Sequence, residues 1–191
     1  MRTLRLFMTM SCDGFFAGPN GELDWMLTTP DPEQNADIVD LISSADTGIM
    51  GYPVAVGMIP FWSQVAADPG ATEGSRAIAT AIAKARAVVL SSAPVDATLD
   101  NAEIVVARGD DQVRKAVLAV KDQPGRDIGV PGGIRTARTV IRLGLVDEYV
   151  LMVHPVALGK GQRIFADRTD LTLTDAKAYA SGITRLTYRP R

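Results

Sequence analysis

Two adjacent glycines, Gly132 and Gly133, have the residue type and spacing that best suit the binding of a nucleotide phosphate in this sequence. They follow a short apolar segment, 127–130, and precede a helical pattern that begins at Ile134. A strand, two glycines and a helix place unhindered backbone N–H groups at the positive end of the helix, where a pyrophosphate binds. A tight turn between strand and helix would use the same glycines, so both interpretations stand.

Three other strand ends carry small or polar residues. These are Gly51, Ser91 with Ser92, and a long loop rich in turn residues that begins at Ser11. In an open α/β sheet, ligands bind beyond the carboxyl ends of the strands. The sequence therefore predicts a ligand site at one edge of the sheet, shared by these segments and the glycine pair.

Asp13 and Asp24 are candidates for proton transfer, because a carboxylate can orient a ring nitrogen or relay a proton. Asp13 precedes a glycine, so it could equally be a turn residue bonded to local backbone. Trp25 could stack on a substrate, or could be a core anchor. For Trp62, packing is the favoured interpretation.

The sequence contains one cysteine, Cys12, and one histidine, His154. An intrachain disulfide is impossible, and a histidine-rich zinc site or a Ser-His-Asp triad would depend on His154 alone. We expect His154 to be a half-buried residue of an apolar strand and not the proton donor. Cys12 is expected to fill space, with a reactive role left open by its position.

Composition places the chain among ordinary globular proteins. It has 191 residues, of which 47% are hydrophobic and 22% are charged, with a net charge of -2. We expect one domain over residues 1–191. The charges are scattered, so nucleic acid is not expected as a partner. No apolar run of membrane-spanning length and no signal segment is seen, so we expect a cytoplasmic protein without a membrane partner.

The hydrophobic pattern alternates between strands and helices, and ends with strands alone. Helices are expected over 32–44, 76–84, 110–120 and 134–143, with Asp110 as an N-cap and 68–75 as a surface loop. Strands are expected over 4–10, 47–50, 87–90, 104–106, 127–130, 149–156, 171–176 and 184–188. This order predicts a three-layer α/β/α fold, with a mainly parallel sheet and an antiparallel C-terminal edge.

Several segments occur in an order that resembles the dihydrofolate-reductase-like family, which includes the reductase domain of riboflavin biosynthesis. The first is Met10 to Gly21, followed by Asp24 and Trp25. The glycine pair comes next, and then Gly144 to Tyr149 and Val153 to Gly159, with Gly161 and Phe165 after them. The resemblance spans nearly the whole chain, and it is more specific for the fold than for the substrate.

This resemblance implies a homodimeric reductase that uses NADPH, with NADH possible, on a small substrate. The substrate would be a pteridine-like or pyrimidine-like heterocycle or a carbonyl compound. The implied catalytic residues are Asp13 and Asp24, and the implied substrate-binding residues are Ser11, Trp25 and His154. The implied cofactor-binding residues are Ala17, Gly51, Tyr52, Leu90, Ser91, Ser92, Pro131, Gly132, Gly133, Ile134 and Thr136.

The chain departs from the family pattern at three positions in two phosphate-binding segments. The family commonly has Gly-Arg-x-Thr-Tyr where this chain has 51–55, with Tyr52 and Val54 replacing the side-chain donors. Ala93 stands where an arginine often contacts the 2′-phosphate. Each lost arginine removes charge-assisted hydrogen bonds of about 1.5 to 3 kcal/mol. A non-catalytic ligand-binding relative, or a relative that uses a flavin, is therefore the alternative, unless an arginine elsewhere compensates. The candidates are Arg76, Arg86 and Arg108.

Overall fold

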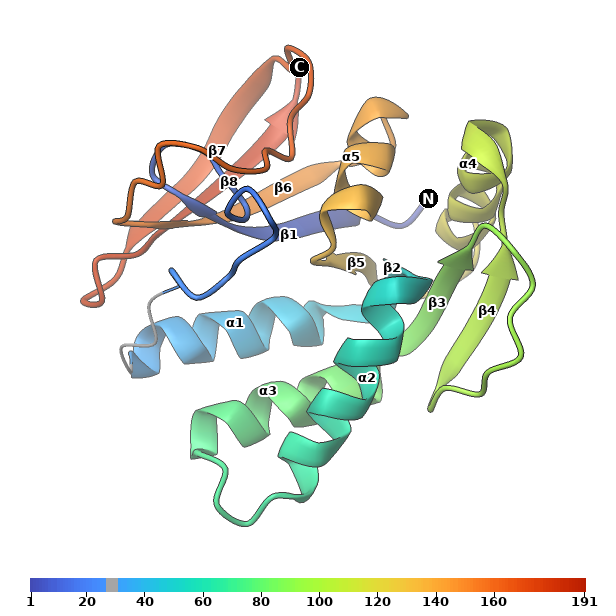
Figure 1. Ribbon diagram of the computed structural model, residues 1–191, viewed down its shortest axis with the longest axis horizontal. Helices are drawn as coiled ribbons and strands as arrows, with labels where there is room; N and C mark the ends of the chain where they lie inside the picture. The colour runs from blue at the N-terminus through green and yellow to red at the C-terminus, as the bar shows by residue number, and fades with distance from the viewer. Residues whose placement is uncertain (27–30) are drawn as a thin grey trace.

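One eight-stranded sheet runs through the molecule (Figure 1), in a computed structural model that describes residues 1–26 and 31–191. The strand order is β4-β3-β2-β5-β1-β6-β8-β7. Neighbours from β4 to β6 are parallel, whereas β8 is antiparallel to both β6 and β7. The strands are β1 (Leu4–Ser11), β2 (Ala45–Gly51), β3 (Arg86–Ser91), β4 (Ala102–Val106), β5 (Asp127–Pro131), β6 (Glu148–His154), β7 (Leu171–Ala178) and β8 (Thr184–Pro190).

Helices lie on both sides of this sheet. Figure 1 shows α4 and α5 on one side, and α1 with α2 and α3 on the other. The helices are α1 (Pro32–Ser44), α2 (Tyr52–Ala67), α3 (Glu73–Lys84), α4 (Gly109–Lys121) and α5 (Ile134–Arg142). The predicted three-layer α/β class, with a mainly parallel sheet and an antiparallel C-terminal edge, is confirmed. No helix in the described ranges is long and apolar enough to cross a membrane.

Several element boundaries differ from the prediction. Helix α2 was not predicted, because Gly57 and Pro60 interrupt a segment that is apolar on nearly every side. Helix α3 begins three residues earlier than expected, since the Thr72 side chain accepts a hydrogen bond from Ser75 N. Asp110 is not an N-cap but lies in the first turn of α4, where it pairs with Arg142.

Strand β6 ends at His154 instead of at residue 156. Pro155 follows directly, and a proline has no N–H group to continue a strand ladder.

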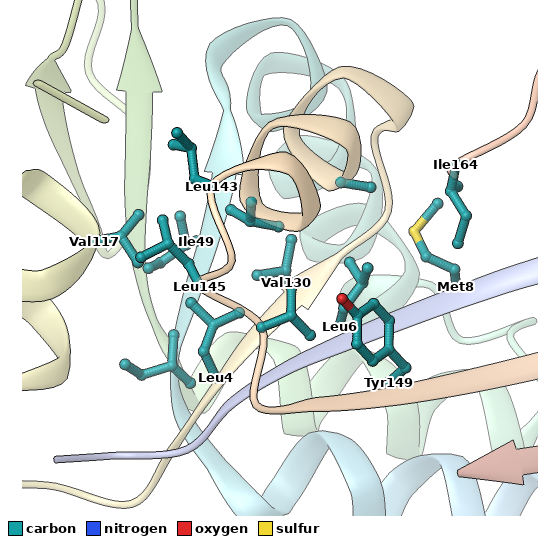
Figure 2. Close-up of a cluster of buried hydrophobic side chains, with 14 of the residues drawn as sticks. Leu4, Leu6, Met8, Ile49, Val117, Val130, Leu143, Leu145, Tyr149 and Ile164 are labelled. Atoms are coloured by element: carbon teal, nitrogen blue, oxygen red, sulfur yellow. The ribbon is translucent and has the colours of Figure 1, made fainter. Parts of the chain in front are cut away.

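The main core fills the space between the sheet and the helices α4 and α5 (Figure 2). Strand β1 contributes Leu4, Leu6 and Met8, all at most 1% exposed, and its intervening residues point to the other side of the sheet. Leu6 lies between Val130 of β5 and Tyr149 of β6 in the register of the sheet. This side of the sheet is therefore densely packed with apolar side chains.

Candidate functional site

The α1 side of the sheet holds a large cavity instead of a filled core. Its volume is about 1220 Å³, above the range of roughly 300–1,000 Å³ that is usual for small-molecule sites. Strands β1, β2 and β5 form its floor, and α1, α2 and α3 supply its other walls. Helix α1 has no fully buried residue, because its apolar face lines this cavity.

Gly132 and Gly133 lie on the cavity wall at the start of α5, in backbone conformations that favour glycine. Their φ angles are 64° and 80°, and a Cβ atom on Gly132 would meet nothing within 4 Å. Gly133 is the N-cap of α5, and no side chain caps this end of the helix. The first N–H groups of α5 are thus not satisfied by a capping side chain, and the residues at this positive end of the helix line the cavity.

The start of α2 approaches the start of α5 very closely. A Cβ atom on Gly51 would lie 2.9 Å from Oγ1 of Thr136, and one on Gly133 would lie 2.7 Å from Cγ2 of Val54. Gly51 is the N-cap of α2 and also lacks a side-chain capping bond. Two helix N-termini without side-chain caps therefore converge on the same wall of the cavity, which is an arrangement that attracts a phosphate.

All the residues that the sequence predicted for the cofactor line this one cavity. They come from the loop after β1, the ends of β2, β3 and β5, and the first turns of α2 and α5. They are Ala17, Gly51, Tyr52, Leu90, Ser91, Ser92, Pro131, Gly132, Gly133, Ile134 and Thr136. Ala17 is held in place by its carbonyl oxygen, which accepts a hydrogen bond from Gln162 N at 2.8 Å.

Of the three arginines considered as replacements for the missing family arginines, Arg108 lies beside the predicted cofactor residues. Its Nε donates to the carbonyl oxygen of Ser92 at 3.1 Å, at the N-cap of α4. Arg86 contacts the side chains of Gln123 and Glu103 instead. The guanidinium of Arg76 donates to backbone carbonyls of the loop before α3.

Asp13 does not line the cavity, and its carboxylate joins two loops. It accepts hydrogen bonds from Ser11 Oγ at 2.6 Å, from Gly159 N at 2.7 Å and from Leu158 N at 3.1 Å. These bonds, with that from Ser11 the largest cause, lower the pKa of Asp13 to about 2. The geometry favours the alternative that Asp13 is a turn residue. Ser11 is likewise buried behind the cavity wall, where its Oγ also accepts from Phe15 N.

His154 lines the cavity at the end of β6 and is 5% exposed. Burial lowers the pKa of its imidazole, which is therefore neutral near pH 7. Trp25 packs edge-on against it, with ring centroids 5.5 Å apart at 80°, and the buried Nε1 of Trp25 has no hydrogen-bond partner among the described residues. Asp24 is exposed and does not line the cavity.

Further residues of the cavity wall were not predicted as site residues. They include Phe7 and Thr9 of β1, Gln34 and Ile38 of α1, and Trp62 of α2. Trp62 was expected to pack in the core, but it is half-buried at the cavity with its ring against Phe61. The helical spacing of apolar residues in α1 was a signal, but a cavity-lining face and a core-facing face have the same spacing.

A comparison with protein families matches residues 2–184 to the RibD C-terminal domain. The chain belongs to this family. The resemblance to dihydrofolate-reductase-like proteins is thus confirmed, and with it membership of a family of reductases. Among similar sequences is the uncharacterized protein YyaP of Bacillus subtilis (strain 168), which is 29% identical over 190 residues, covering 98% of this chain and 94% of YyaP.

Solved structures of similar fold extend this comparison. A diaminohydroxyphosphoribosylaminopyrimidine deaminase/5-amino-6-(5-phosphoribosylamino)uracil reductase from Thermotoga maritima matches with a TM-score of 0.69 at 12% identity, over 100% of this chain and 57% of that one. The dihydrofolate reductase of Enterococcus faecalis, complexed with NADP(H), matches with a TM-score of 0.59 at 16% identity, over 99% and 96% of the two chains. At these identities the likeness shows a shared fold.

Proposed function

We propose that this chain is a nicotinamide-dependent reductase that transfers hydride from NADPH to a C=N or C=O group of a small substrate. The observation that carries the proposal is the convergence of the α2 and α5 N-termini on the glycine-lined wall of the cavity. In a member of the RibD C-terminal family, these positive helix ends are suited to the pyrophosphate of the cofactor.

The residues present fit such a cofactor. Gly132 and Gly133 would let the pyrophosphate approach the backbone, and Ser91 and Ser92 would lie by the adenosine ribose. When bound, the cofactor supplies a hydride from C4 of its nicotinamide, which adds to the acceptor carbon, while the nitrogen or oxygen takes a proton. The acceptor is thereby reduced by two electrons and the cofactor is oxidised.

One side chain of the cavity wall, His154, is suited to orient the substrate. His154 is neutral near pH 7 and could donate or accept a hydrogen bond without adding charge. Asp13 stays ionised at neutral pH and is bonded to backbone N–H groups, so we assign the proton to water and not to Asp13.

Arg108 supplies an argument for NADPH over NADH. Its Nε is bonded to Ser92 O, and its two terminal guanidinium nitrogens, which have no hydrogen bond or ion pair among the described residues, would be available to pair with a 2′-phosphate beside the ribose. We expect Arg108→Ala to weaken NADPH binding by about tenfold or more, the loss of a charge-assisted hydrogen bond, and to leave NADH binding unchanged. Arg168→Ala, at a side chain that is 86% exposed and remote from Ser91 in sequence, is the matched control.

The test of the proposal is a fluorescence titration of the purified protein with NADPH and with NADH. Trp62 lines the cavity and Trp25 contacts its wall at His154, so both report on ligand binding. We expect saturation with a tighter Kd for NADPH. No binding of either nucleotide at millimolar concentration would contradict the proposal.

A second candidate is a ligand-binding relative that has lost the reductase activity. Tyr52 and Val54, which stand at the phosphate positions of the family pattern, favour it. This candidate predicts that the cavity binds a ligand and that no hydride transfer follows. Loss of NADPH absorbance that depends on an added pteridine or carbonyl compound would exclude it, and a yellow protein on purification would point to a flavin instead.

A further inference from the structure

The cavity continues past the proposed cofactor wall into an apolar compartment between α1, α3 and the sheet. Leu41 and Ile42 of α1 and Ile82 of α3 line it. These three side chains belong to none of the buried core clusters and are only half-buried. Leaving large apolar side chains against empty space forgoes the burial that normally stabilises such helices. The compartment is therefore suited to an apolar guest.

Glycines form the floor of this compartment. Gly48 of β2 pairs with Gly129 of β5 in the sheet, and Ala87 of β3 lies on the other side of Gly48. A Cβ atom on Gly48 would meet only Met50 Cε, at 3.6 Å, and one on Gly129 would lie 3.8 Å from the nearest atom, the Cβ of Ala45. Glycine weakens a strand interior and often marks the close approach of a ligand. Here the missing side chains hollow the floor opposite α1 and α3.

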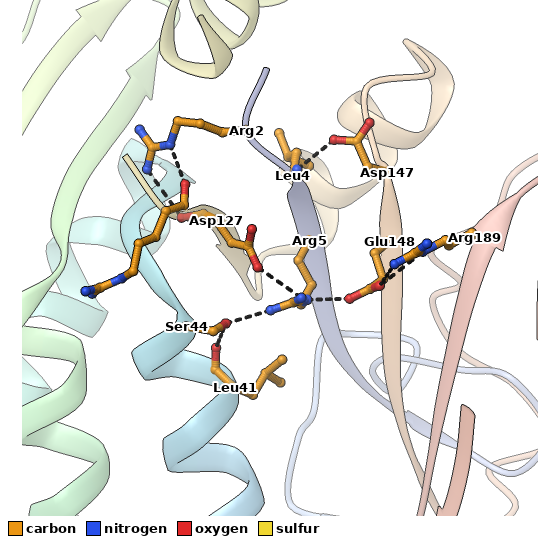
Figure 3. Close-up of polar contacts among 10 residues, drawn as sticks. Arg2, Leu4, Arg5, Leu41, Ser44, Asp127, Asp147, Glu148 and Arg189 are labelled. Atoms are coloured by element: carbon orange, nitrogen blue, oxygen red, sulfur yellow. Dashed lines mark hydrogen bonds and ion pairs between the residues drawn. The ribbon is translucent and has the colours of Figure 1, made fainter. Parts of the chain in front are cut away.

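The arginines on this side of the cavity are already paired with protein groups. Arg5 donates to Ser44 Oγ and to Glu148 Oε1, both at 2.6 Å, and its third nitrogen lies 3.0 Å from Asp127 Oδ2 (Figure 3). Arg86 contacts Gln123 and Glu103. The remaining arginine of the described lining, Arg135, is exposed in the first turn of α5, beside the cofactor glycines.

A phosphorylated substrate would need free cations in this compartment. Among the described residues, Arg5 and Arg86 are paired with protein groups and Arg135 lies at the cofactor wall, so the compartment itself offers none. A buried phosphate or carboxylate without a partner would be strongly disfavoured. An apolar chain would instead gain from contact with the walls. The charge distribution and the glycine floor thus both favour an uncharged molecule with an apolar chain.

We propose that the substrate is an uncharged, elongated compound with a reducible carbonyl or imine group at the cofactor wall and an apolar chain in the compartment over Gly48 and Gly129. This inference rests on the proposed reductase function and specifies its substrate class. The acceptor carbon gains the hydride and its oxygen or nitrogen gains a proton from water, so the chain itself takes no part in the chemistry.

The test is a homologous series of phenyl ketones, from acetophenone to hexanophenone, with 5-benzoylpentanoate as an analogue whose chain ends in a carboxylate. Binding to the protein without NADPH is measured by calorimetry. Affinity should rise with each methylene by up to about fourfold, the factor for about 0.8 kcal/mol per buried CH₂, and the terminal carboxylate should remove this gain. Turnover, followed by NADPH absorbance, should show the same order in kcat/KM.

Substitutions of the floor glycines test whether the apolar chain binds over Gly48 and Gly129. Gly48→Val fills the space with a side chain that suits a strand, and should remove the gain from the longer chains without changing the NADPH affinity. Thr172→Val, on the exposed surface of β7, is the matched control and should behave as the unmodified protein. If thermal melting shows that Gly48→Val does not fold, Gly129→Ala tests the same floor with a smaller group.

Two results would overturn the inference while leaving the reductase proposal intact. They are an affinity that stays flat along the ketone series in a protein that binds NADPH, and tighter binding of the carboxylate analogue than of hexanophenone. Absence of NADPH binding would instead overturn the reductase proposal itself, and with it the assignment of the ketone as a substrate.

Discussion

The carboxylate of Asp13 connects the loop after β1 with the loop after β6, which lie far apart in the sequence. Both backbone N–H groups that bind this carboxylate belong to residues 158–159. Gly161 follows shortly after them, and a Cβ atom on Gly161 would lie 2.2 Å from the carbonyl oxygen of Ala17. The two loops are thus fixed against each other around Ala17, one of the predicted cofactor-binding residues.

A stability measurement across pH tests this structural role. The pKa of Asp13 is lowered from 3.8 to about 2 in the folded protein, so its ionised form stabilises the fold above pH 4, and that contribution is lost as the pH falls from 4 to 2. We expect Asp13→Asn to lower the Tm at pH 7 and the difference from the unmodified protein to shrink toward pH 2. Asp96→Asn, in an exposed loop, is the control. Equal Tm values at pH 7 would contradict the structural role.

Single residues were predictable where the backbone determines their place. Gly132 and Gly133 could be identified because glycine, a preceding strand and a following helix occur together in the sequence. The positions of Asp13 and Asp24 were not predictable in the same way. Whether a carboxylate faces a cavity or a neighbouring loop depends on the residues brought near it by the fold, such as Gly159.

At the scale of elements, the two ends of α5 offer a matched pair of glycines, one before the helix and one after it. Gly132 and Gly144 have φ angles of 64° and 62°, and a Cβ atom at either would meet nothing within 4 Å. Alanine at either position forces a left-handed conformation, at about 1–2 kcal/mol of folding stability. We expect equal losses in denaturant unfolding, but a fall in NADPH affinity of about tenfold, or about 1.4 kcal/mol, for Gly132→Ala alone. Equal NADPH affinities of the two variants would place the pyrophosphate elsewhere.

Elements with strong periodic patterns were predictable, and those without were not. Helix α1 begins at the predicted Pro32, because Asp31 accepts a hydrogen bond from Gln34 N at 2.9 Å. Helix α2 contains Gly57 and Pro60 and presents apolar residues on several faces. Helix α2 lies between the cavity and solvent, so it has no single apolar face. For this reason its position could not be predicted from a regular apolar period.

At the scale of the whole molecule, the two sides of the sheet differ in packing. The side of α4 and α5 (Figure 1) is filled by buried side chains, among them Val117 (Figure 2) and Val140. The α1 side encloses the cavity. Segments with few buried apolar contacts open with a lower free energy than a core does. The fold class was predictable, but this asymmetry was not, because apolar residues of both layers have the same periodicity.

Hydrogen exchange provides a test of this asymmetry. In the free protein we expect amides of α1 and α3 to exchange faster than those of α5. A cavity ligand added at about 100 times its Kd stabilises the folded protein against opening by about 2.7 kcal/mol. Amide exchange in α1 and α3 should therefore slow by up to about 100-fold. Amides of α4, on the packed side, are the internal control. Uniform protection across helices α1 to α5 in the free protein would contradict the asymmetry.

The single domain, the homodimer and the cytoplasmic location stay predictions. Sedimentation measurements on the purified protein check the homodimer.

Successive side chains of strand β1 point to opposite sides of the sheet. Substitutions on one side can therefore change ligand binding while the packed core on the other side stays intact. Leu4, Leu6 and Met8 point into the packed layer, whereas Phe7 and Thr9 face the cavity. A mutational library at Phe7 and Thr9 would therefore sample new ligand preferences on an intact scaffold. The same diversity at Leu4, Leu6 and Met8 would fall in the packed layer and lower the stability of the fold, so on this strand new ligand preferences are accessible at alternate positions.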